Sequence, residues 1–210
     1  KKVIIKGHSG FKGILLALYI CHLGVNVLGI SNAYSTNPNH FKLLKSKLKI
    51  KSLNIDISNL NKLDKVVKYY KPDFVFHLAA QALVGKSYID PISTFKSNTI
   101  GTLNLLQSLR NLKKKCTAII ITSDKSYKNL EINRGYREED LLGGKDPYSA
   151  SKGAAEMILH CYSNIFFNKK DNIKIAIARA GNVIGGGDWS EDRLIPDCVK
   201  SWALKKKVVL

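Results

Sequence analysis

The sequence is poor in cysteine, and its four cysteines are spread along the chain. Cys21, Cys116, Cys161 and Cys198 form no C-x-x-C pair and no other closely spaced group. Zinc sites and disulfide-stapled folds both need paired or closely spaced cysteines. We therefore expect reduced, mostly buried thiols of a cytoplasmic protein, and no bound metal.

Long apolar runs are also missing. No stretch reaches about 18 consecutive apolar residues, the length that a membrane-spanning helix needs, so we expect no membrane partner. The chain starts at Lys1 without a methionine and ends at Val208–Leu210, which is typical of the start of a strand. These ends predict a fragment that is cut at both sides.

Acidic residues are scarce, because 34 lysines and arginines face 16 aspartates and glutamates, for a net charge of +18. A charge of this size is compatible with nucleic-acid binding. However, only five basic residues are arginines, the lysines are scattered, and no aromatic-interleaved RNA-binding motif is present. We expect no nucleic-acid partner and assign the charge to attraction of a small anionic substrate, with a basic RNA-binding module as an alternative.

The 210 residues suffice for one α/β domain with a sizeable core. Short continuous apolar runs, typical of strands covered on both faces, alternate with helical patterns. The expected strands are Val3–Ile5, Val25–Ile30, Leu53–Ile55, Phe74–His77, Ala118–Thr122 and Ile173–Ala178. The expected helices are Ile14–Leu23, Leu60–Tyr70, Pro91–Leu112 and Pro147–Phe167. This order predicts an α/β fold with a doubly wound parallel sheet.

A glycine-rich turn follows the first expected strand. Gly7, Gly10 and Gly13 have the spacing G-x-x-G-x-x-G and are followed by an apolar helix. In a strand–turn–helix unit such glycines allow a tight turn, a close approach to a pyrophosphate, and packing of the helix on the strand. The helix N-terminus then faces the phosphates. The turn therefore predicts dinucleotide binding, although an isolated motif of this kind could be an ordinary glycine turn.

Tyr148 and Lys152 are four residues apart, which places their side chains on the same face of a helix. Asp146 suits the N-cap of that helix and Pro147 suits its first position. A neighbouring cation favours the phenolate form of a tyrosine. Such a tyrosine can take a proton from a sugar or alcohol hydroxyl, so the pair predicts proton transfer.

Ser123, Asp124 and Lys125 follow the fifth expected strand. In parallel α/β sheets, ligands bind beyond the carboxyl ends of the strands, so we predict that these residues join Tyr148 and Lys152 in one catalytic cluster. Two simpler interpretations stay open. Asp124 could cap a turn, and Lys125 could be a solvated loop lysine.

Taken together, these motifs resemble those of the extended short-chain dehydrogenase/reductase superfamily and, within it, the CDP-glucose 4,6-dehydratases. The matching segments are Gly7–Gly13, Phe76–Gln81, Thr122–Lys125, Asp146–Lys152, Ala180–Trp189 and Arg193–Asp197. The glycine and tyrosine motifs are generic to the superfamily. The Ser-Asp-Lys and Gly-Gly-Gly-Asp-Trp segments narrow the resemblance. It implies a Rossmann fold with an NAD-binding domain over residues 1–180 and the start of a smaller, truncated substrate-binding lobe over residues 181–210.

The resemblance implies that CDP-glucose is converted to a 4-keto-6-deoxy sugar with catalytic NAD, for deoxysugar synthesis in surface lipopolysaccharide. The steps are oxidation at C4, elimination of water across C5 and C6, and hydride return to C6. Tyr148 would take the proton of the 4-hydroxyl beside Lys152, and Ser123 would hydrogen-bond the 4-oxygen. Asp124 would be the acid for the leaving hydroxyl, and Lys125 would be the C5 base or a stabiliser of the enolate.

The resemblance also implies binding residues and an oligomer. The expected NAD-binding residues are Gly7, Ser9, Gly10, Phe11, Lys12, Gly13, Asp56, Ile57, Leu78, Ala79, Ala80, Tyr148 and Lys152. The expected substrate-binding residues are Gln81, Ser87, Asn182 and Arg193. The superfamily pairs through helices that match Pro91–Leu112 and Pro147–Phe167, which implies a homo-oligomer, either a dimer or a tetramer. His77 is expected to pack on the cofactor side and Asn98 to hold helix to strand.

Three positions depart from the family pattern. Lys6 stands where threonine is usual, Ser31 and Asn32 end the second strand without the acid that holds the NAD ribose, and Gly85 replaces a common arginine. The missing acid leaves NADP open as the cofactor. Two further functions also stay open, namely a sugar-nucleotide 4-epimerase of the same superfamily and a non-catalytic nucleotide-binding module.

Overall fold

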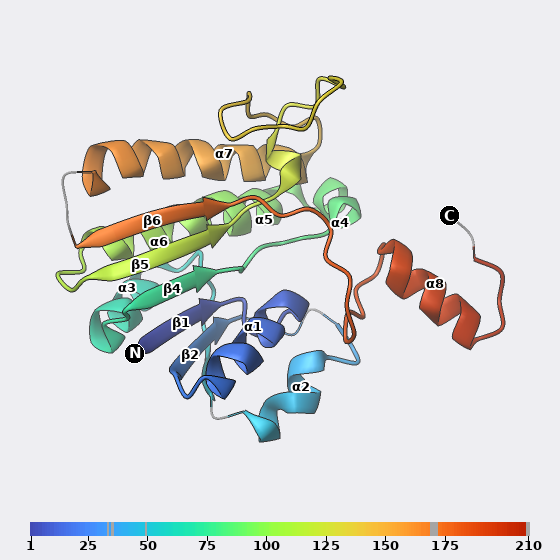
Figure 1. Ribbon diagram of the computed structural model, residues 1–210, viewed down its shortest axis with the longest axis horizontal. Coiled ribbons are helices and arrows are strands. Elements are labelled where there is room, and N and C mark those ends of the chain that lie inside the picture. Colours follow the sequence, from blue (N-terminus) through green and yellow to red (C-terminus); the bar gives the residue numbers. More distant parts are fainter. Residues whose placement is uncertain (33, 35, 49, 169–171, 209–210) are drawn as a thin grey trace.

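A six-stranded parallel sheet forms the centre of the protein (Figure 1). The computed structural model describes residues 1–32, 34, 36–48, 50–168 and 172–208. The strands are β1 (Lys2–Lys6), β2 (Asn26–Ser31), β3 (Ile50–Asn54), β4 (Phe74–His77), β5 (Cys116–Ile121) and β6 (Ile173–Ala178). They lie in the order β3-β2-β1-β4-β5-β6, and every neighbouring pair is parallel. This arrangement confirms the predicted α/β fold with a doubly wound parallel sheet.

Five of the six strands match their predicted positions to within two residues. The exception is β3, which begins at Ile50, three residues before the predicted Leu53. The prediction relied on continuous apolar runs, and β3 lies at the edge of the sheet, where Lys51 and Ser52 are exposed. An edge strand does not need two apolar faces, so its sequence does not show the pattern of a buried strand.

Eight α-helices lie within the described residues. They are α1 (Phe11–His22), α2 (His40–Leu44), α3 (Leu60–Tyr70), α4 (Val84–Ile89), α5 (Pro91–Phe95), α6 (Gly101–Arg110), α7 (Pro147–Tyr162) and α8 (Leu194–Ala203). The predicted helix from Pro91 to Leu112 is formed by α5 and α6, joined by a π-helical segment over Lys96–Ile100. The helix predicted over Pro147–Phe167 is α7 followed by a second π-helical segment. The short helices α2 and α4, and the terminal helix α8, were not predicted.

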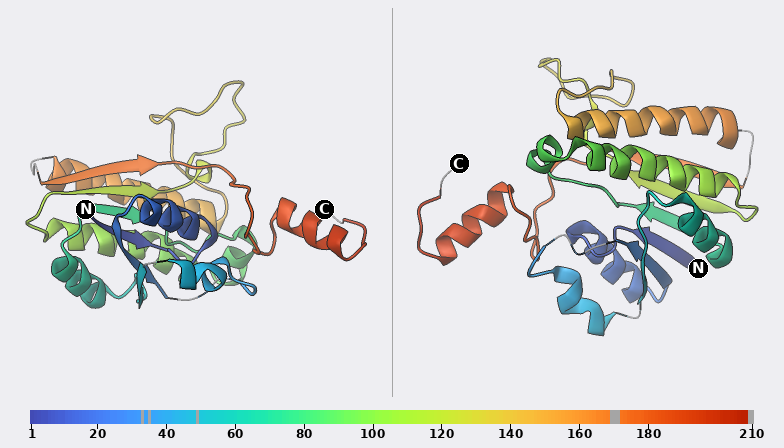
Figure 2. Two further views of the ribbon diagram at one scale, coloured as in Figure 1. Left: turned by 60° about the horizontal axis from the view of Figure 1, so that its bottom comes forward. Right: turned by 180° about the vertical axis from the view of Figure 1, so that it is seen from behind.

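Helices cover both faces of the sheet (Figures 1 and 2). On one face Ile4 of β1 lies in a large apolar cluster with Leu63 of α3, Leu105 of α6 and Leu159 of α7. On the other face, a smaller cluster joins the neighbouring β1 residues to Ala17 and Ile20 of α1, among others. Burial on both faces explains why the strand sequences are continuously apolar.

The helix that carries the tyrosine motif begins where the sequence predicts. The Asp146 side chain accepts a hydrogen bond of 2.9 Å from the Ser149 amide, and Pro147 occupies the first turn. Capping of this kind satisfies an amide that the helix itself leaves unpaired. It fixes the register of α7 and therefore the direction in which Tyr148 and Lys152 point.

After β6 the chain leaves the sheet and runs without regular structure to α8, which stands apart from the rest (Figures 1 and 2). The division at residue 180 into a cofactor domain and a substrate lobe stays a prediction. In the strand expected at Val208–Leu210, Val208 is not in a strand, and residues 209 and 210 lie outside the described residues.

All four cysteines are free thiols, but only Cys116 and Cys198 are buried, because Cys21 is half-buried and Cys161 is exposed. The prediction of mostly buried thiols is therefore correct for half of them. No helix in the described ranges combines the length and apolarity that crossing a membrane requires. In the same ranges, no group of three or more His, Cys, Asp or Glu side chains could hold a metal ion.

Lys6 is fully buried at the end of β1. It pairs in register with His77 of β4 and shares a sheet face with Ile4, so its side chain enters the larger apolar cluster. Among the described residues its Nζ has no hydrogen-bond partner. Burial lowers the pKa of Lys6 from 10.5 to about 7. An unpaired amine in such a place destabilises the fold.

Replacing Lys6 by methionine should therefore stabilise the protein. We expect Lys6→Met to raise the free energy of unfolding by about 1–3 kcal/mol near neutral pH, the usual cost of an unsatisfied buried polar group. Below pH 7 the amine is charged in both states and the penalty is fully present. Between pH 7 and 10.5 it is charged only when unfolded, so the advantage of the variant should shrink as the pH rises.

Urea unfolding across that pH range measures the effect. The matched control is Lys62→Met, because Lys62 is an exposed lysine on α3. The control should show no pH-dependent gain. An equal or lower stability of Lys6→Met at neutral pH would show that the amine has a partner in solution.

Candidate active site

The glycine loop joins β1 to α1 at a point where only glycine fits. Gly7 has φ +87°, and a Cβ on it would lie 2.7 Å from the Ala79 amide nitrogen. A Cβ on Gly13 would lie 2.0 Å from the Gly7 carbonyl oxygen, so α1 rests directly on the turn. Gly10 is the N-cap of α1 and has no side chain to cap the helix. The amides of the first turn are therefore open to an anion.

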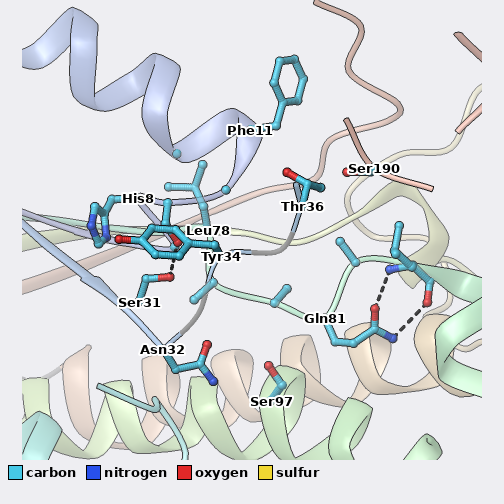
Figure 3. Close-up of a pocket in the computed structure, with 18 of the residues that line it drawn as sticks. His8, Phe11, Ser31, Asn32, Tyr34, Thr36, Leu78, Gln81, Ser97 and Ser190 are labelled. Atoms are coloured by element: carbon cyan, nitrogen blue, oxygen red, sulfur yellow. Dashed lines mark hydrogen bonds between the residues drawn. The ribbon is translucent and has the colours of Figure 1, made fainter. Parts of the chain in front are cut away.

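A cavity of about 1670 Å³ opens beside this loop (Figure 3). The predicted cofactor residues that line it are Gly7, Ser9, Gly10, Phe11, Lys12, Gly13, Asp56, Ile57, Leu78, Ala79 and Ala80. The predicted substrate residues Gln81 and Arg193 also line it, whereas Ser87, Asn182, Tyr148 and Lys152 are absent from its wall. The carboxyl ends of β1 to β4 thus converge on a space large enough for a dinucleotide.

The wall beyond β2 is built from hydroxyl and amide groups. Ser31, at the end of β2, forms a hydrogen bond of 2.6 Å through its Oγ with the Oγ of Ser9, which belongs to the glycine loop (Figure 3). Asn32 hydrogen-bonds the carboxylate of Asp56, which follows β3. Although partial burial opposes it, hydrogen bonds from Ser58 and Asn32 and the charge of Lys96 lower the pKa of Asp56. Ser31 and Asn32 stand at the end of β2, where an acid was expected, and the ionised Asp56 follows the neighbouring strand β3.

Ser123, Asp124 and Lys125 form a short turn at the end of β5. Ser123 Oγ donates to Asp124 Oδ1 over 2.9 Å, and the Lys125 amide donates to the same Oδ1 over 2.8 Å. The cap of this turn is Ser123, whose Oγ accepts a hydrogen bond of 3.2 Å from the Lys125 amide, and Asp124 is the first residue of the turn rather than its cap. The side chain of Asp124 is exposed, as is that of Lys125, so both can reach a bound molecule.

Tyr148 and Lys152 lie one turn apart on α7, and both are buried, with exposed fractions of 8% and 7%. The Ser123 hydroxyl lies near enough to that of Tyr148 to affect its pKa. Burial raises the pKa of Tyr148, while Ser123 and the charge of Arg193 lower it. The sequence interpretation assigned this cationic effect to Lys152, whereas in the structure Arg193 is the cation that lowers the pKa of Tyr148.

Lys152 is itself strongly affected by its surroundings. Burial, followed by the charge of Lys12, lowers the pKa of Lys152 to about 8, and the carboxylate of Glu156 opposes this effect. Its Nζ donates to the Ile121 carbonyl oxygen over 3.5 Å, at the limit of a hydrogen bond. The amine is therefore held beside the end of β5, close to Ser123.

The charge of Lys12, in the glycine loop, interacts with groups in the turn after β5 and in the segment before α8. Burial and the charge of Arg193 lower the pKa of Lys12, and the carboxylates of Asp124 and Asp188 oppose this. Because these charges act on one another, the glycine loop, the β5 turn and the segment before α8 meet at the same place. The structure thus brings together most of the residues that the sequence nominated.

Ser87, Asn98 and His77 are held by hydrogen bonds within the fold. Ser87 is buried, and its hydroxyl donates to the Val84 carbonyl oxygen within α4. Asn98 Oδ1 accepts a hydrogen bond of 2.8 Å from the Gln81 amide, and Asn98 Nδ2 donates one of 3.0 Å to the Gln81 carbonyl oxygen. These bonds are expected for a residue that holds helix to strand. His77 lies 3.1 Å from Thr102 of α6 and is not part of the cavity wall, so it packs against a helix rather than on the cofactor side.

Sequence reasoning missed one polar group beside the site, the buried ion pair of Glu156 and Arg179. Glu156 Oε2 accepts hydrogen bonds of 2.8 and 2.6 Å from Arg179. A glutamate one turn after Lys152, on the buried face of an apolar helix, was the available signal. The arginine that pairs with it follows β6 and could not be identified without the fold.

Known proteins are similar to this chain in sequence and in fold. The family model described as GDP-mannose 4,6 dehydratase matches residues 4–208. The CDP-glucose 4,6-dehydratase of Salmonella typhimurium is 41% identical over all of this chain and 60% of that protein. The UDP-glucose 4-epimerase of Thermotoga maritima, solved with UDP-glucose, has a TM-score of 0.86 at 22% identity and covers 99% of this chain and 65% of its own. The UDP-glucuronic acid 4-epimerase of Bacillus cereus, solved with UDP-glucuronic acid and NAD, gives 0.85 at 24%, over 98% and 64%.

The family match covers the segments that form the candidate site. The family match includes the glycine loop, the turn after β5 and the tyrosine helix α7. The two epimerase structures, at under 25% identity, show the fold alone. The chain spans 60% of the length of the Salmonella relative. The superfamily predicted from the motifs is confirmed, and the chain belongs to the GDP-mannose 4,6-dehydratase family of extended short-chain dehydrogenases/reductases.

Proposed function

We propose that the complete protein is an NAD-dependent sugar-nucleotide 4,6-dehydratase that converts CDP-glucose to CDP-4-keto-6-deoxyglucose. The observation that carries this proposal is the exposed Asp124 beside the buried pair of Tyr148 and Lys152. An elimination needs such an acid, whereas a simple oxidation and reduction at C4 does not. The 41% identity to a CDP-glucose 4,6-dehydratase supports the same choice of reaction and substrate.

The glycine loop fits NAD. The open amides at the N-terminus of α1 suit a pyrophosphate, and no side chain could replace Gly7 without meeting the backbone of Ala79. Asp56 and Asn32 are placed to bind the adenosine part, because both line the cavity beyond β2 and β3. When bound, NAD supplies the hydride acceptor for C4 of the sugar and the hydride donor for C6.

In the oxidation step, Tyr148 takes the proton of the 4-hydroxyl. Ser123, whose hydroxyl lowers the pKa of Tyr148, is proposed to hydrogen-bond the same sugar oxygen. Ser123 and Arg193 both lower the pKa of Tyr148 against the effect of burial, which increases the share of phenolate that can accept the proton. Lys152, one turn along α7, orients the pair from the side of the cofactor.

In the elimination step, the 4-keto group acidifies the C5 proton. Lys125 removes that proton or stabilises the enolate that results, and Asp124 gives a proton to the departing 6-hydroxyl. Both side chains are exposed next to the buried Tyr148 and can therefore contact the far end of the sugar. Asn182 and Arg193 are proposed to contact the substrate from the segment that follows β6.

The reaction and the nucleotide are tested together by mass spectrometry. CDP-, UDP-, GDP- and dTDP-glucose are incubated separately with NAD and the complete protein. We expect loss of one water from CDP-glucose alone. Water loss from a different nucleotide would retain the chemistry and refute the CDP assignment. No water loss from any of them, with NAD still bound, would favour a 4-epimerase or a non-catalytic nucleotide-binding module.

Asp124→Asn separates a dehydratase from a 4-epimerase. General acid catalysis contributes about 10²–10⁴-fold, so we expect water loss to slow by that factor. Asp64→Asn, on the surface helix α3, is the control and should keep full activity. Release of water from CDP-glucose at the normal rate by Asp124→Asn would contradict the acid role. A variant that only interconverts the two 4-epimers of the sugar would point to the alternative function.

We further propose that the protein forms a homodimer through α4, α5 and α7. Exposed apolar side chains gather on these helices and the π-helical segments that extend α5 and α7, namely Tyr88, Ile89, Ile92, Phe95, Ile100, Met157 and Ile165. An exposed apolar surface of this kind usually marks a protein interface. Helices of the superfamily pair in this way.

A charge placed on this surface should disrupt the dimer. Ile92 and Met157 are 79% and 66% exposed, so glutamate at either position costs little in the monomer. We expect Ile92→Glu with Met157→Glu to give half the molecular mass in light scattering. Leu43→Glu on α2, where leucine is 63% exposed, is the control and should stay dimeric. An unchanged mass in the double variant would place the interface elsewhere.

A further inference from the structure

One buried carboxylate connects three elements next to the catalytic turn. Glu156 is fully buried and lies one turn after Lys152 on α7. Its Oε2 accepts hydrogen bonds from Arg179 Nε at 2.8 Å and Nη2 at 2.6 Å. Its Oε1 accepts a hydrogen bond of 2.6 Å from the Thr122 hydroxyl. Thr122 follows β5 and Arg179 follows β6, so Glu156 ties α7 to the carboxyl ends of both strands.

The arginine is itself held in place from the opposite side. Its guanidinium lies 4.4 Å from the ring centre of Tyr127, and Nη1 donates to the Glu138 carbonyl oxygen over 3.1 Å. Tyr127 and Glu138 belong to the loop between β5 and α7, which projects beyond the sheet in Figure 1. Arg179 can therefore not turn away from Glu156 without breaking these contacts.

Backbone hydrogen bonds between the segments after β5 and β6 also restrict the position of Ser123. The Thr122 amide donates to the Ala178 carbonyl oxygen at 3.0 Å, and the Asp124 amide donates to the Ala180 carbonyl oxygen at 3.2 Å. Ser123 lies between these two bonds, and its hydroxyl lowers the pKa of Tyr148, which is on the same helix as Glu156. These hydrogen bonds fix the segment that carries Ser123 relative to α7, which carries Tyr148.

Stability alone does not explain a buried ion pair of this kind. Removing two charges from water is costly, and apolar residues of the same volume are often as stabilising or more so. What a buried network does provide is a single geometry, because each hydrogen bond holds only in one arrangement. Here the fixed arrangement is that of Ser123 relative to Tyr148.

We propose that Glu156 is a positioning residue of the active site, which acts through the Thr122 hydroxyl to hold the Ser123 hydroxyl against that of Tyr148. Its effect on catalysis rests on the proposed function, whereas its effect on geometry does not. A substitution of Thr122 is a better test than one of Glu156. Removal of the Glu156 carboxylate would leave the charge of Arg179 buried and unpaired and would destabilise the fold.

The experiment compares Thr122→Val with Thr122→Ser in the complete protein. Valine has nearly the shape of threonine and lacks the hydroxyl, whereas serine keeps it. The first readout is the titration of Tyr148, followed by NMR of ring-labelled tyrosine and assigned by the signal lost in Tyr148→Phe. The groups that act on Tyr148 are Ser123, Arg193, Asp124 and Asp146. Because Ser123 lowers the pKa of Tyr148, Thr122→Val should raise that pKa and Thr122→Ser should not.

The second readout is turnover of CDP-glucose. Misplacement of a reacting group by a remote substitution costs up to about 100-fold in rate, so we expect Thr122→Val to lower kcat by about 10-fold or more with little change in KM. Thr122→Ser should rescue kcat. An unchanged Tyr148 titration in Thr122→Val, or an equal shift in both variants, overturns the proposal. If the unmodified protein releases no water from any sugar nucleotide, the proposed function fails, and the Tyr148 titration still decides the positioning role.

Discussion

The boundary between β1 and β4 is the constraint on which the rest of the structure depends. The chain runs from β1 through β2 to β3 on one side and from β4 through β5 to β6 on the other. The segments that leave these two strands therefore diverge and leave an opening at the carboxyl end of the sheet. The backbones on its two sides come so close that a Cβ on Gly7 would lie 2.7 Å from the Ala79 nitrogen. The cavity therefore requires glycine at that position.

Two buried charged residues show how differently burial can act. Lys6 and Glu156 are both fully shielded from water. Glu156 has Arg179 and Thr122 as partners, so its burial defines the relative position of three elements. Lys6 has no partner among the described residues, so its burial only costs stability. Nothing in the structure explains why a lysine stands at the end of β1. A buried charged group thus fixes the geometry around it only where it has partners, as Glu156 does and Lys6 does not.

Sequence reasoning succeeded where local physics decides the structure. Asp146 and Pro147 define the start of α7 from neighbouring residues alone, and continuous apolar runs reveal strands buried on both faces. It failed where a distant residue decides. The edge strand β3 needs only one buried face, and the cation that lowers the pKa of Tyr148 is Arg193, which follows β6. The motifs identified which residues meet, but the distribution of charge among them required the fold.

The exposure of the four candidate catalytic side chains supports a division of the chemistry between them. Tyr148 and Lys152 are buried, where burial and nearby charges adjust their proton affinities. Asp124 and Lys125 are exposed on a short turn. Removal of a hydroxyl proton during oxidation benefits from a dry, fixed base, whereas elimination must release water and therefore suits groups with access to solvent. The Ser123 hydroxyl donates to Asp124 and also lowers the pKa of Tyr148, so a small displacement of Ser123 would affect both pairs of residues.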